Sequence, residues 1–444
     1  MRQATKIART ALFTALLGAG LAGPALAQGE RERALEARVA ELERLVQALV
    51  SQQQQQVTQI EEVKVVQALQ PAPTPAGKPP IQSVTLTPAA APGTAIRLGG
   101  YVKADFLATR TGDGQLTDGA VGRALYLPGQ IPVGGTSSGT DYDAHAKFSR
   151  VNLGIDSVTE AGNTFGAFFE VDFFGNSLGN QNATNTYGTT LRHAYMTWNG
   201  WLAGQTWSNL MDLTAMPETV DFIGPTDAIV FVRQAQLRYT AGGFSAALEN
   251  PETVLVGAGA SDRGAMPDLT LRYGWKGGWG TFGIGAIARQ LRVDRASAGD
   301  SELGVGVTLG GKWVLGANDD LRYQLTVGDG ISRYIGLAIT GDAVLDGDGR
   351  LDLIGARAGY LGWRHAFSPK LRSNLVYARS DYDNDIALAG AGATRTAQSL
   401  RANLFYTPLP KVDVGAELMF GKREVEGGAD GDLTRLQFTT KYSF

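Results

Sequence analysis

The 444-residue sequence contains no cysteine, only three histidines and no hydrophobic run long enough for a membrane-spanning helix. Without cysteine, the chain has neither a disulfide framework nor a thiol nucleophile. His145, His193 and His365 lie in different expected elements, so they assemble neither a metal cluster nor a histidine-centred catalytic site. Any insertion into a membrane must therefore use strands, which cross lipid only as closed barrels.

The first 27 residues have the pattern of a secretory signal peptide. Arg2, Lys6 and Arg9 precede an apolar run over 11–21, and the small residues of 25–27 suit cleavage. Removing these three positive charges takes the formal charge of the chain from −3 to −6, which is mild for its size. The sequence gives no reason to expect nucleic acid as a partner.

Residues 28–70 follow the signal peptide and carry a heptad repeat. Val at position a with Leu at position d favours a coiled coil of two helices, whereas extra apolar residues beside the seam favour three or more helices. We expect a self-associating coiled coil in the periplasm; a single amphipathic helix packed on the barrel is the alternative. The two sets of seam positions are Leu35, Leu42, Leu49, Gln56 and Val63, and Val39, Val46, Gln53, Ile60 and Gln67.

Residues 71–94 hold seven prolines and read as an extended, semi-stiff linker. Residues 95–444 then alternate apolar and polar residues with a period of two, which predicts strands. The last segment, 433–444, ends on Phe444 of its apolar face, as in bacterial outer-membrane barrels whose final strand closes against the first. We predict sixteen antiparallel strands: 96–109, 147–158, 164–174, 189–198, 201–207, 230–240, 243–249, 268–275, 279–293, 303–315, 321–328, 352–364, 371–382, 398–407, 411–423 and 433–444.

The connections between these segments alternate between long polar loops and short turns such as Asn199-Gly200, which is typical of an outer-membrane barrel. Six of the seven tryptophans lie beside short turns, as an interfacial aromatic girdle requires. The sequence therefore predicts an all-β transmembrane barrel preceded by an α-helical coiled coil.

With the apolar set facing lipid, the polar set faces the lumen, where basic residues outnumber acidic ones. Clustered guanidinium groups attract anions and bind carboxylate or phosphate with two hydrogen bonds. Alternatively, such arginines pair with inward-facing Asp or Glu. The candidate pore-lining residues are Arg97, Lys103, Arg150, Arg192, Arg238, Arg272, Arg322, Arg372 and Arg401.

The loop over 208–229 is more apolar than a solvated loop needs to be. This composition favours a loop folded into the barrel, where Asp212, Glu218 and Asp221 would face the arginines and narrow the pore. Packing on a neighbouring subunit is the alternative. Elsewhere, Asp346–Asp352 superficially matches a calcium-binding loop but lacks its required glycine and third ligand, and we expect neither a metal site nor a cofactor.

Several short motifs accompany the signal-peptide pattern and the heptad repeat: Gly99–Asp105, Arg192–Tyr195, Ala203–Asn209, Pro217–Phe222 and Leu371–Tyr377. In these features together the sequence resembles the DcaP-type trimeric outer-membrane porins. The resemblance implies a homotrimer of sixteen-stranded pores, held partly by a periplasmic coiled coil, that passes small anionic solutes such as dicarboxylates.

We therefore expect a passive, anion-preferring porin of the bacterial outer membrane and not an enzyme. Its expected partners are two further copies of the chain, outer-membrane lipid and lipopolysaccharide, and small anions. Two alternatives remain open: a phosphate-selective porin, and a structural tether that uses the coiled coil to link the membrane to the cell wall.

Overall fold

The computed structural model describes residues 94–444 except 138, 160, 176–186, 258–263 and 295–298. The predicted signal peptide, coiled coil and most of the linker lie outside the described residues. No helix among the described residues is long and apolar enough to cross a membrane.

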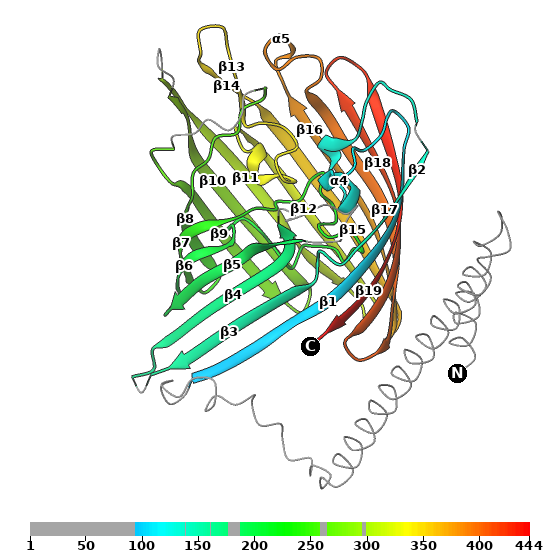
Figure 1. Ribbon diagram of the computed structural model, residues 1–444. Helices are drawn as coiled ribbons and strands as arrows, with labels where there is room; N and C mark the ends of the chain where they lie inside the picture. Colours follow the sequence, from blue (N-terminus) through cyan, green and yellow to red (C-terminus); the bar gives the residue numbers. More distant parts are fainter. Residues whose placement is uncertain (1–93, 138, 160, 176–186, 258–263, 295–298) are drawn as a thin grey trace, which may run out of the picture. The chain divides into compact units, whose positions relative to one another are not determined.

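The described chain forms one closed antiparallel sheet, seen in Figure 1 as a ring of tilted strands. The first and last strands pair with each other, as predicted; Phe106 lies opposite Phe438. The strands are β1 (Thr94–Thr111), β2 (Thr140–His145), β3 (Arg150–Val158), β4 (Thr164–Gly175), β5 (Gly188–Trp198), β6 (Trp201–Trp207), β7 (Arg233–Ala241), β8 (Phe244–Glu249), β9 (Asp268–Gly277), β10 (Gly280–Asp294), β11 (Gly299–Leu315), β12 (Asp319–Asp329), β15 (Gly355–Ser368), β16 (Leu371–Asp383), β17 (Thr394–Leu409), β18 (Val412–Val425) and β19 (Asp430–Ser443).

The second barrel strand is interrupted: β3 matches the predicted strand 147–158, whereas β2 lies in the connection that was predicted to be a loop. β1 pairs with β3 along its first half and with β2 along its second half, so β2 and β3 together make one barrel strand. Counted in this way, the barrel has the sixteen strands predicted from the sequence. The remaining elements lie in the loops: the hairpin β13 (Ala343–Leu345) and β14 (Leu351–Leu353), the short helices α4 (Val121–Ala124) and α5 (Ile386–Ala389), and the 3-10 turns η1 (Pro128–Gln130) and η2 (Ser332–Tyr334).

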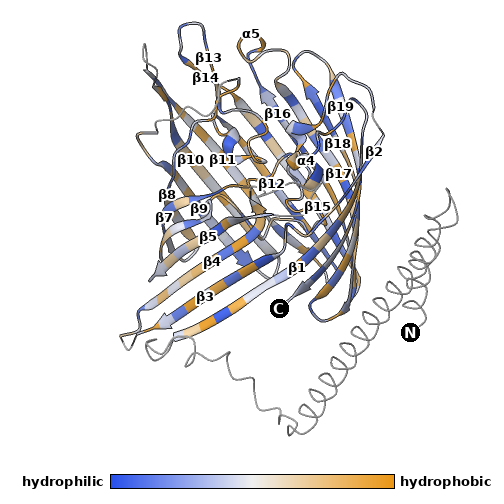
Figure 2. Ribbon diagram, viewed as in Figure 1, coloured by the Kyte–Doolittle hydropathy of each residue, from blue (hydrophilic) through white to orange (hydrophobic). Residues whose placement is uncertain are grey.

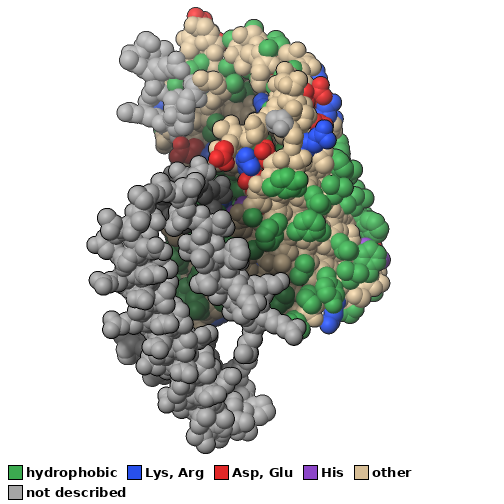
Figure 3. Space-filling model, turned by 45° about the vertical axis from the view of Figure 1, so that its right-hand side comes forward, with side chains coloured by type: hydrophobic (Ala, Val, Ile, Leu, Met, Phe, Trp, Pro, Cys, Tyr) green, Lys and Arg blue, Asp and Glu red, His purple; other side chains and the backbone are tan. Residues whose placement is uncertain are grey.

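Hydrophobic and hydrophilic residues alternate along the strands (Figure 2), and hydrophobic side chains are spread over the outside of the wall (Figure 3). The outward Phe106 and Phe438 are 53% and 49% exposed, whereas the inward Asp105 is fully buried. The predicted tryptophan girdle is present at the turn end of the strands, where its six members are all exposed: Trp198, Trp201, Trp275, Trp279, Trp313 and Trp363.

The lumen is partly filled by loops. Side chains from the segments 124–131, 208–232 and 331–339 pack together and against inward-facing residues of β15 and β16. The inward residues of these two strands that belong to this cluster are Ala356, Ala358, Tyr360, Ala378 and Tyr382, all buried. The three alanines leave room for an inserted loop.

The wall is low over β6, β7 and β8, which have seven, nine and six residues. β5 pairs with β6 only from Trp198 to Ala194, so the part of β5 beyond Ala194 has no partner on β6. β6 ends at Trp207, and the loop over 208–232 turns into the lumen at this point. The result is a slot in the wall between β5 and β6.

Candidate functional site

The loop over 208–232, called the inserted loop below, crosses the lumen and is tied to one side of the barrel. At its start, the buried carboxylate of Glu249 on β8 accepts hydrogen bonds from Ser208 Oγ (3.1 Å) and the Asn209 backbone N–H (2.8 Å). Towards its end, the backbone N–H of Val230 donates to Gln324 on β12 (2.8 Å). The inserted loop thus lies inside the barrel, as predicted from its apolar composition.

All three predicted acidic residues of the inserted loop make specific contacts. Asp212 pairs with Arg272 of β9 at 2.7 Å. Glu218 accepts two hydrogen bonds from the Arg372 guanidinium of β16, at 2.7 and 2.6 Å. Asp221 instead accepts from backbone N–H groups of its own loop and from the Tyr126 backbone N–H (2.8 Å).

Four of the predicted pore arginines hold this arrangement in place. Besides Arg272 and Arg372, Arg322 of β12 donates to the Met216 carbonyl (2.6 Å) and to Asp320 (2.8 Å). Arg401 of β17 is buried; it donates to Ser399 Oγ (3.1 Å) and lies 3.7 Å from Glu417. Their charges are therefore matched by carboxylates or carbonyls of the inserted loop and the neighbouring wall.

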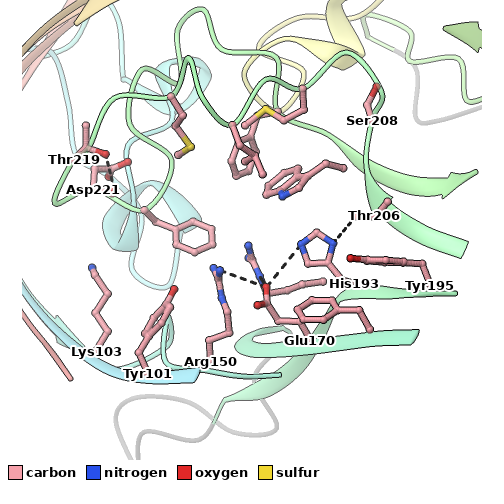
Figure 4. A pocket seen from close by; sticks show the side chains of 18 of the residues that line it. Tyr101, Lys103, Arg150, Glu170, His193, Tyr195, Thr206, Ser208, Thr219 and Asp221 are labelled. Carbon is pink, nitrogen blue, oxygen red and sulfur yellow. Dashed lines mark hydrogen bonds and ion pairs between the residues drawn. The ribbon is translucent and has the colours of Figure 1, made fainter. Parts of the chain in front are cut away.

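A cavity of about 650 Å³ lies between the inserted loop and the wall formed by β1 and β3–β7 (Figure 4). Tyr101, Lys103, Arg150 and Glu170 reach into it from the strands, while Thr219 and Asp221 approach from the loop. Five cationic side chains and two carboxylates, Glu170 and Asp221, line it. The cations are Lys103, Arg150, Arg192, Arg238 and Lys441.

These cations are paired to different degrees. Arg192 binds Glu170 (2.9 Å) and Asp172 (2.8 Å), and Arg150 lies 3.4 Å from Glu170. Lys103 binds Asp105 (2.5 Å) and the Val220 carbonyl (3.2 Å). Lys441 pairs with Asp413 at 3.1 Å.

Arg238 is the exception: it lines the cavity, and no carboxylate lies within 4 Å of its guanidinium among the described residues. A cation without an acidic partner is available to a diffusing anion.

Aromatic rings hold two of these guanidinium groups in place. Arg150 lies 5.1 Å from the Tyr101 ring and 5.9 Å from the Phe222 ring. Arg192 lies 5.2 Å from Phe222 and 6.0 Å from Trp207. Phe222 on the inserted loop therefore contacts both arginines of the wall, and these contacts stabilise the loop and the two guanidinium groups together.

Arg192 faces inward because β5 contains a bulge. Glu170 pairs with His193, but the next residue of β4, Val171, pairs with Leu191, which leaves Arg192 as the extra residue. Arg192 and His193 are consequently both buried on the lumen side. The bulge also explains why the alternation is poor over 189–198. His193 donates or accepts through Nδ1 with Thr206 Oγ1 at 2.9 Å.

Arg97 lies apart from the other candidates. It pairs with Asp156 at 2.6 Å, and the side chains are 67% and 49% exposed, so the pair is solvated. Arg97 is not among the residues that line the cavity.

A second inward charge network was not predicted from the sequence. Arg289 on β10 is buried and lies 3.2 Å from Asp268 and 3.0 Å from Asp342. The Tyr334 hydroxyl, from the loop after β12, donates to Asp268 at 2.8 Å. The inward side of β10 also carries Ile287, Leu291 and Val293, all buried. Because both faces of β10 are apolar, alternation did not show that Arg289 faces inward.

In the part of the chain that the structure describes, no group of three or more His, Asp or Glu side chains could hold a metal ion. The cavity instead combines cationic side chains with aromatic walls, which can attract and orient small anions.

The sequence matches the DcaP outer membrane protein family over residues 24–444. No curated protein sequence matches the chain. The crystal structure of the outer membrane channel DcaP of Acinetobacter baumannii is similar, with a TM-score of 0.67 and 23% identity, over 79% of this chain and 98% of that one. The anion-selective porin from Comamonas acidovorans has a TM-score of 0.53 and 14% identity, over 79% of this chain and all of that one. Both structures share the barrel fold.

Proposed function

Because the chain belongs to the DcaP outer membrane protein family, we propose that small anionic solutes diffuse passively through its barrel, with dicarboxylates or related organic acids preferred. Family membership makes the protein an outer-membrane channel of the porin type and not an enzyme. The solute class is the part that we propose.

Arg238, which lines the 650 Å³ cavity with no carboxylate within 4 Å among the described residues, carries this proposal together with the other cationic side chains there. In a narrow space with low-dielectric walls, fixed charge raises the local concentration of the opposite ion. Arg150, Arg192 and Arg238 present guanidinium groups, whose fork geometry matches a carboxylate. Their positions on β3, β5 and β7 favour a solute that carries more than one acidic group.

Phosphate is the second candidate solute, since guanidinium groups bind it with the same geometry. The aromatic rings of Tyr101, Phe168, Trp207 and Phe222 also line the cavity. These apolar surfaces favour an organic acid, because they contact a carbon skeleton that phosphate lacks.

We further propose that the mature protein is a homotrimer in the outer membrane, with 28–70 as a periplasmic coiled coil, 71–94 as a linker and 95–444 as the porin domain. The heptad repeat over 28–70 supports self-association. The signal-peptide pattern of residues 1–27 supports export.

Single-channel recording in a planar bilayer tests the solute class. Under a salt gradient we expect a reversal potential of the sign that anion selectivity gives. Succinate added at millimolar concentration should interrupt the current more strongly than phosphate at the same ionic strength. Stronger interruption by phosphate would make the protein a phosphate porin. A folded protein without conductance would support the tether and contradict the proposal.

A further inference from the structure

The cavity has two unlike sides. Its five cationic side chains all come from strands, namely β1, β3, β5, β7 and β19. The inserted loop contributes nine of the lining residues; none of the nine is basic and six are hydrophobic. The hydrophobic ones are Met211, Leu213, Met216, Val220, Phe222 and Phe231. A solute in the cavity therefore meets positive charge on the strand side and an apolar surface on the loop side.

Figure 4 shows this division. The labelled strand residues Lys103, Tyr101 and Arg150 lie opposite Thr219 and Asp221 of the inserted loop, and the sulfur atoms of the methionines lie on the loop side. Asp221 is the charged residue that the loop contributes to the described lining. Its carboxylate disfavours an acid group on the loop side, so the acid groups of a solute are directed to the strand side.

Leu213 is the most exposed residue of the apolar side. It is 56% exposed although it lies in the lumen, where it lines the cavity. The loop is anchored before and after it. Asp212 pairs with Arg272 at 2.7 Å, and the Tyr360 hydroxyl donates to the Ala215 carbonyl at 3.1 Å. These two ties hold Leu213 in contact with water instead of allowing it to pack into the core.

An apolar side chain in contact with water gains free energy when another apolar group covers it. Met211 and Met216 line the same cavity as Leu213. Methionine side chains are flexible and polarizable, so they adapt to carbon skeletons of different shape. The loop side can therefore bind the apolar part of a solute whose acid group lies on the strand side.

We propose that the cavity takes amphipathic organic acids, whose carboxylate binds the cationic strand side and whose apolar chain covers Leu213 on the inserted loop. The proposal rests on the proposed transport of organic acids and adds an apolar chain to the preferred solute. Hexanoate has this chemistry. Acetate has the same charge but lacks the chain.

Single-channel recording of the full-length protein with acetate, butanoate and hexanoate tests the proposal. At neutral pH each acid carries one negative charge, so the three differ in the length of the apolar chain. We expect hexanoate to interrupt the current at a concentration at least about tenfold lower than acetate, with butanoate between them, because each added methylene group covers more apolar surface. Bilayers without protein control for effects of the acids on the membrane itself.

Equal interruption by the three acids would mean that solutes do not use the apolar side, and it would overturn the proposal. Succinate is recorded in the same bilayers to separate this result from a failure of the proposed function. If succinate interrupts the current and chain length has no effect, the proposed function stands and this inference fails. If no carboxylate interrupts the current and the reversal potential shows no anion preference, both fail.

Replacing Leu213 by Ser provides a second test. Because Leu213 is exposed, the barrel should still fold, which heat-modifiability on gels checks. We expect the preference for hexanoate over acetate to fall severalfold in Leu213→Ser. Ile386→Ser is the matched control, since Ile386 of α5 is a 50% exposed hydrophobic residue that is not among the lining residues of the cavity. A preference that Leu213→Ser leaves unchanged would contradict the role given to the inserted loop.

Discussion

At the scale of single residues, the inward-facing arginines divide into two groups. Arg272, Arg322 and Arg372 hold the inserted loop through carboxylates and carbonyls. Arg150 and Arg238 face the open cavity. A charge neutralised by a fixed partner contributes little to the field that a passing ion meets. The sequence showed that all of these residues face inward but not which ones have partners.

Replacing Arg238 by Gln should therefore reduce anion selectivity more than replacing Arg272, Arg322 or Arg372 by Gln, provided that the inserted loop stays in place. We expect the anion-to-cation permeability ratio to fall by about twofold or more, since a cavity charge acts at short range and salt screens it less than an exposed charge. Reversal potentials under a salt gradient measure this ratio.

Arg97→Gln is the control, because it removes the same charge from a solvated pair outside the cavity. Equal effects of the two substitutions would mean that net charge, and not position in the cavity, sets selectivity.

Asp227 of the inserted loop makes the loop sensitive to pH. Burial raises the pKa of its carboxyl to about 6 from an ordinary 3.8, although the nearby Arg401 opposes the shift. The protonated form is thus favoured in the folded loop. Its contribution to stability is complete below pH 3.8 and is lost as the pH rises through about 6.

We expect the open-channel current to be quieter at pH 5 than at pH 8, because the inserted loop is held more firmly when Asp227 is protonated. Asp227→Asn has nearly the same shape and can still form hydrogen bonds with the Tyr126 and Ser399 hydroxyls, but its side chain does not titrate. A pH dependence that persists unchanged in Asp227→Asn would assign the effect to another group.

At the scale of elements, the two-pronged contact between Glu218 and Arg372 is the central tie between the inserted loop and the wall. Hydrogen bonds between charged groups contribute about 1.5–3 kcal/mol each when shielded from solvent. An exposed ion pair contributes about 0–1 kcal/mol.

Arg372→Gln should therefore loosen the loop, giving larger and noisier single-channel currents and a lower unfolding temperature of the barrel. Arg357→Gln breaks an exposed pair with Asp383 and should change neither quantity measurably. Gel heat-modifiability and bilayer recording report the two effects. Quiet, wild-type currents from Arg372→Gln would show that the other ties suffice to hold the loop.

Alternation and turn residues were sufficient to predict sixteen strands and their antiparallel order. Each strand has an apolar outer face and a more polar inner face, so its residues alternate along the sequence. The apolar composition of 208–229 was also sufficient to place that loop in the lumen. Alternation is poor around Arg192, where a bulge changes the parity, although Arg192 was predicted to face inward and does so. It gave no direction for β10, whose inward face packs on loops. Pairing of the arginines depends on contacts between distant segments, which periodicity does not encode.

At the scale of the whole molecule, each barrel holds its own cavity, so assembly and conduction are separable. Leu42→Asp together with Leu49→Asp places charge in the predicted heptad seam, and we expect the proposed trimer to dissociate at a lower temperature. The size of each current step should not change. Native gels over a temperature series and step amplitudes in bilayers measure the two properties.

The control is Ala37→Asp together with Arg44→Gln, since both positions lie on the outer side of the heptad and the pair changes the net charge by the same amount as the seam variant. Unchanged trimer stability in the seam variant would mean that the barrels alone hold the subunits together.

The attachments of the inserted loop reach around most of the barrel. Residues 208–232 precede every strand from β7 onward in the chain, yet their partners lie on β8, β9, β12, β16 and β18. The Val220 carbonyl also accepts a hydrogen bond from Gln437 of the last strand (3.5 Å). We therefore expect the inserted loop to gain its full set of ties only when the strands that follow it, including the last, are in place.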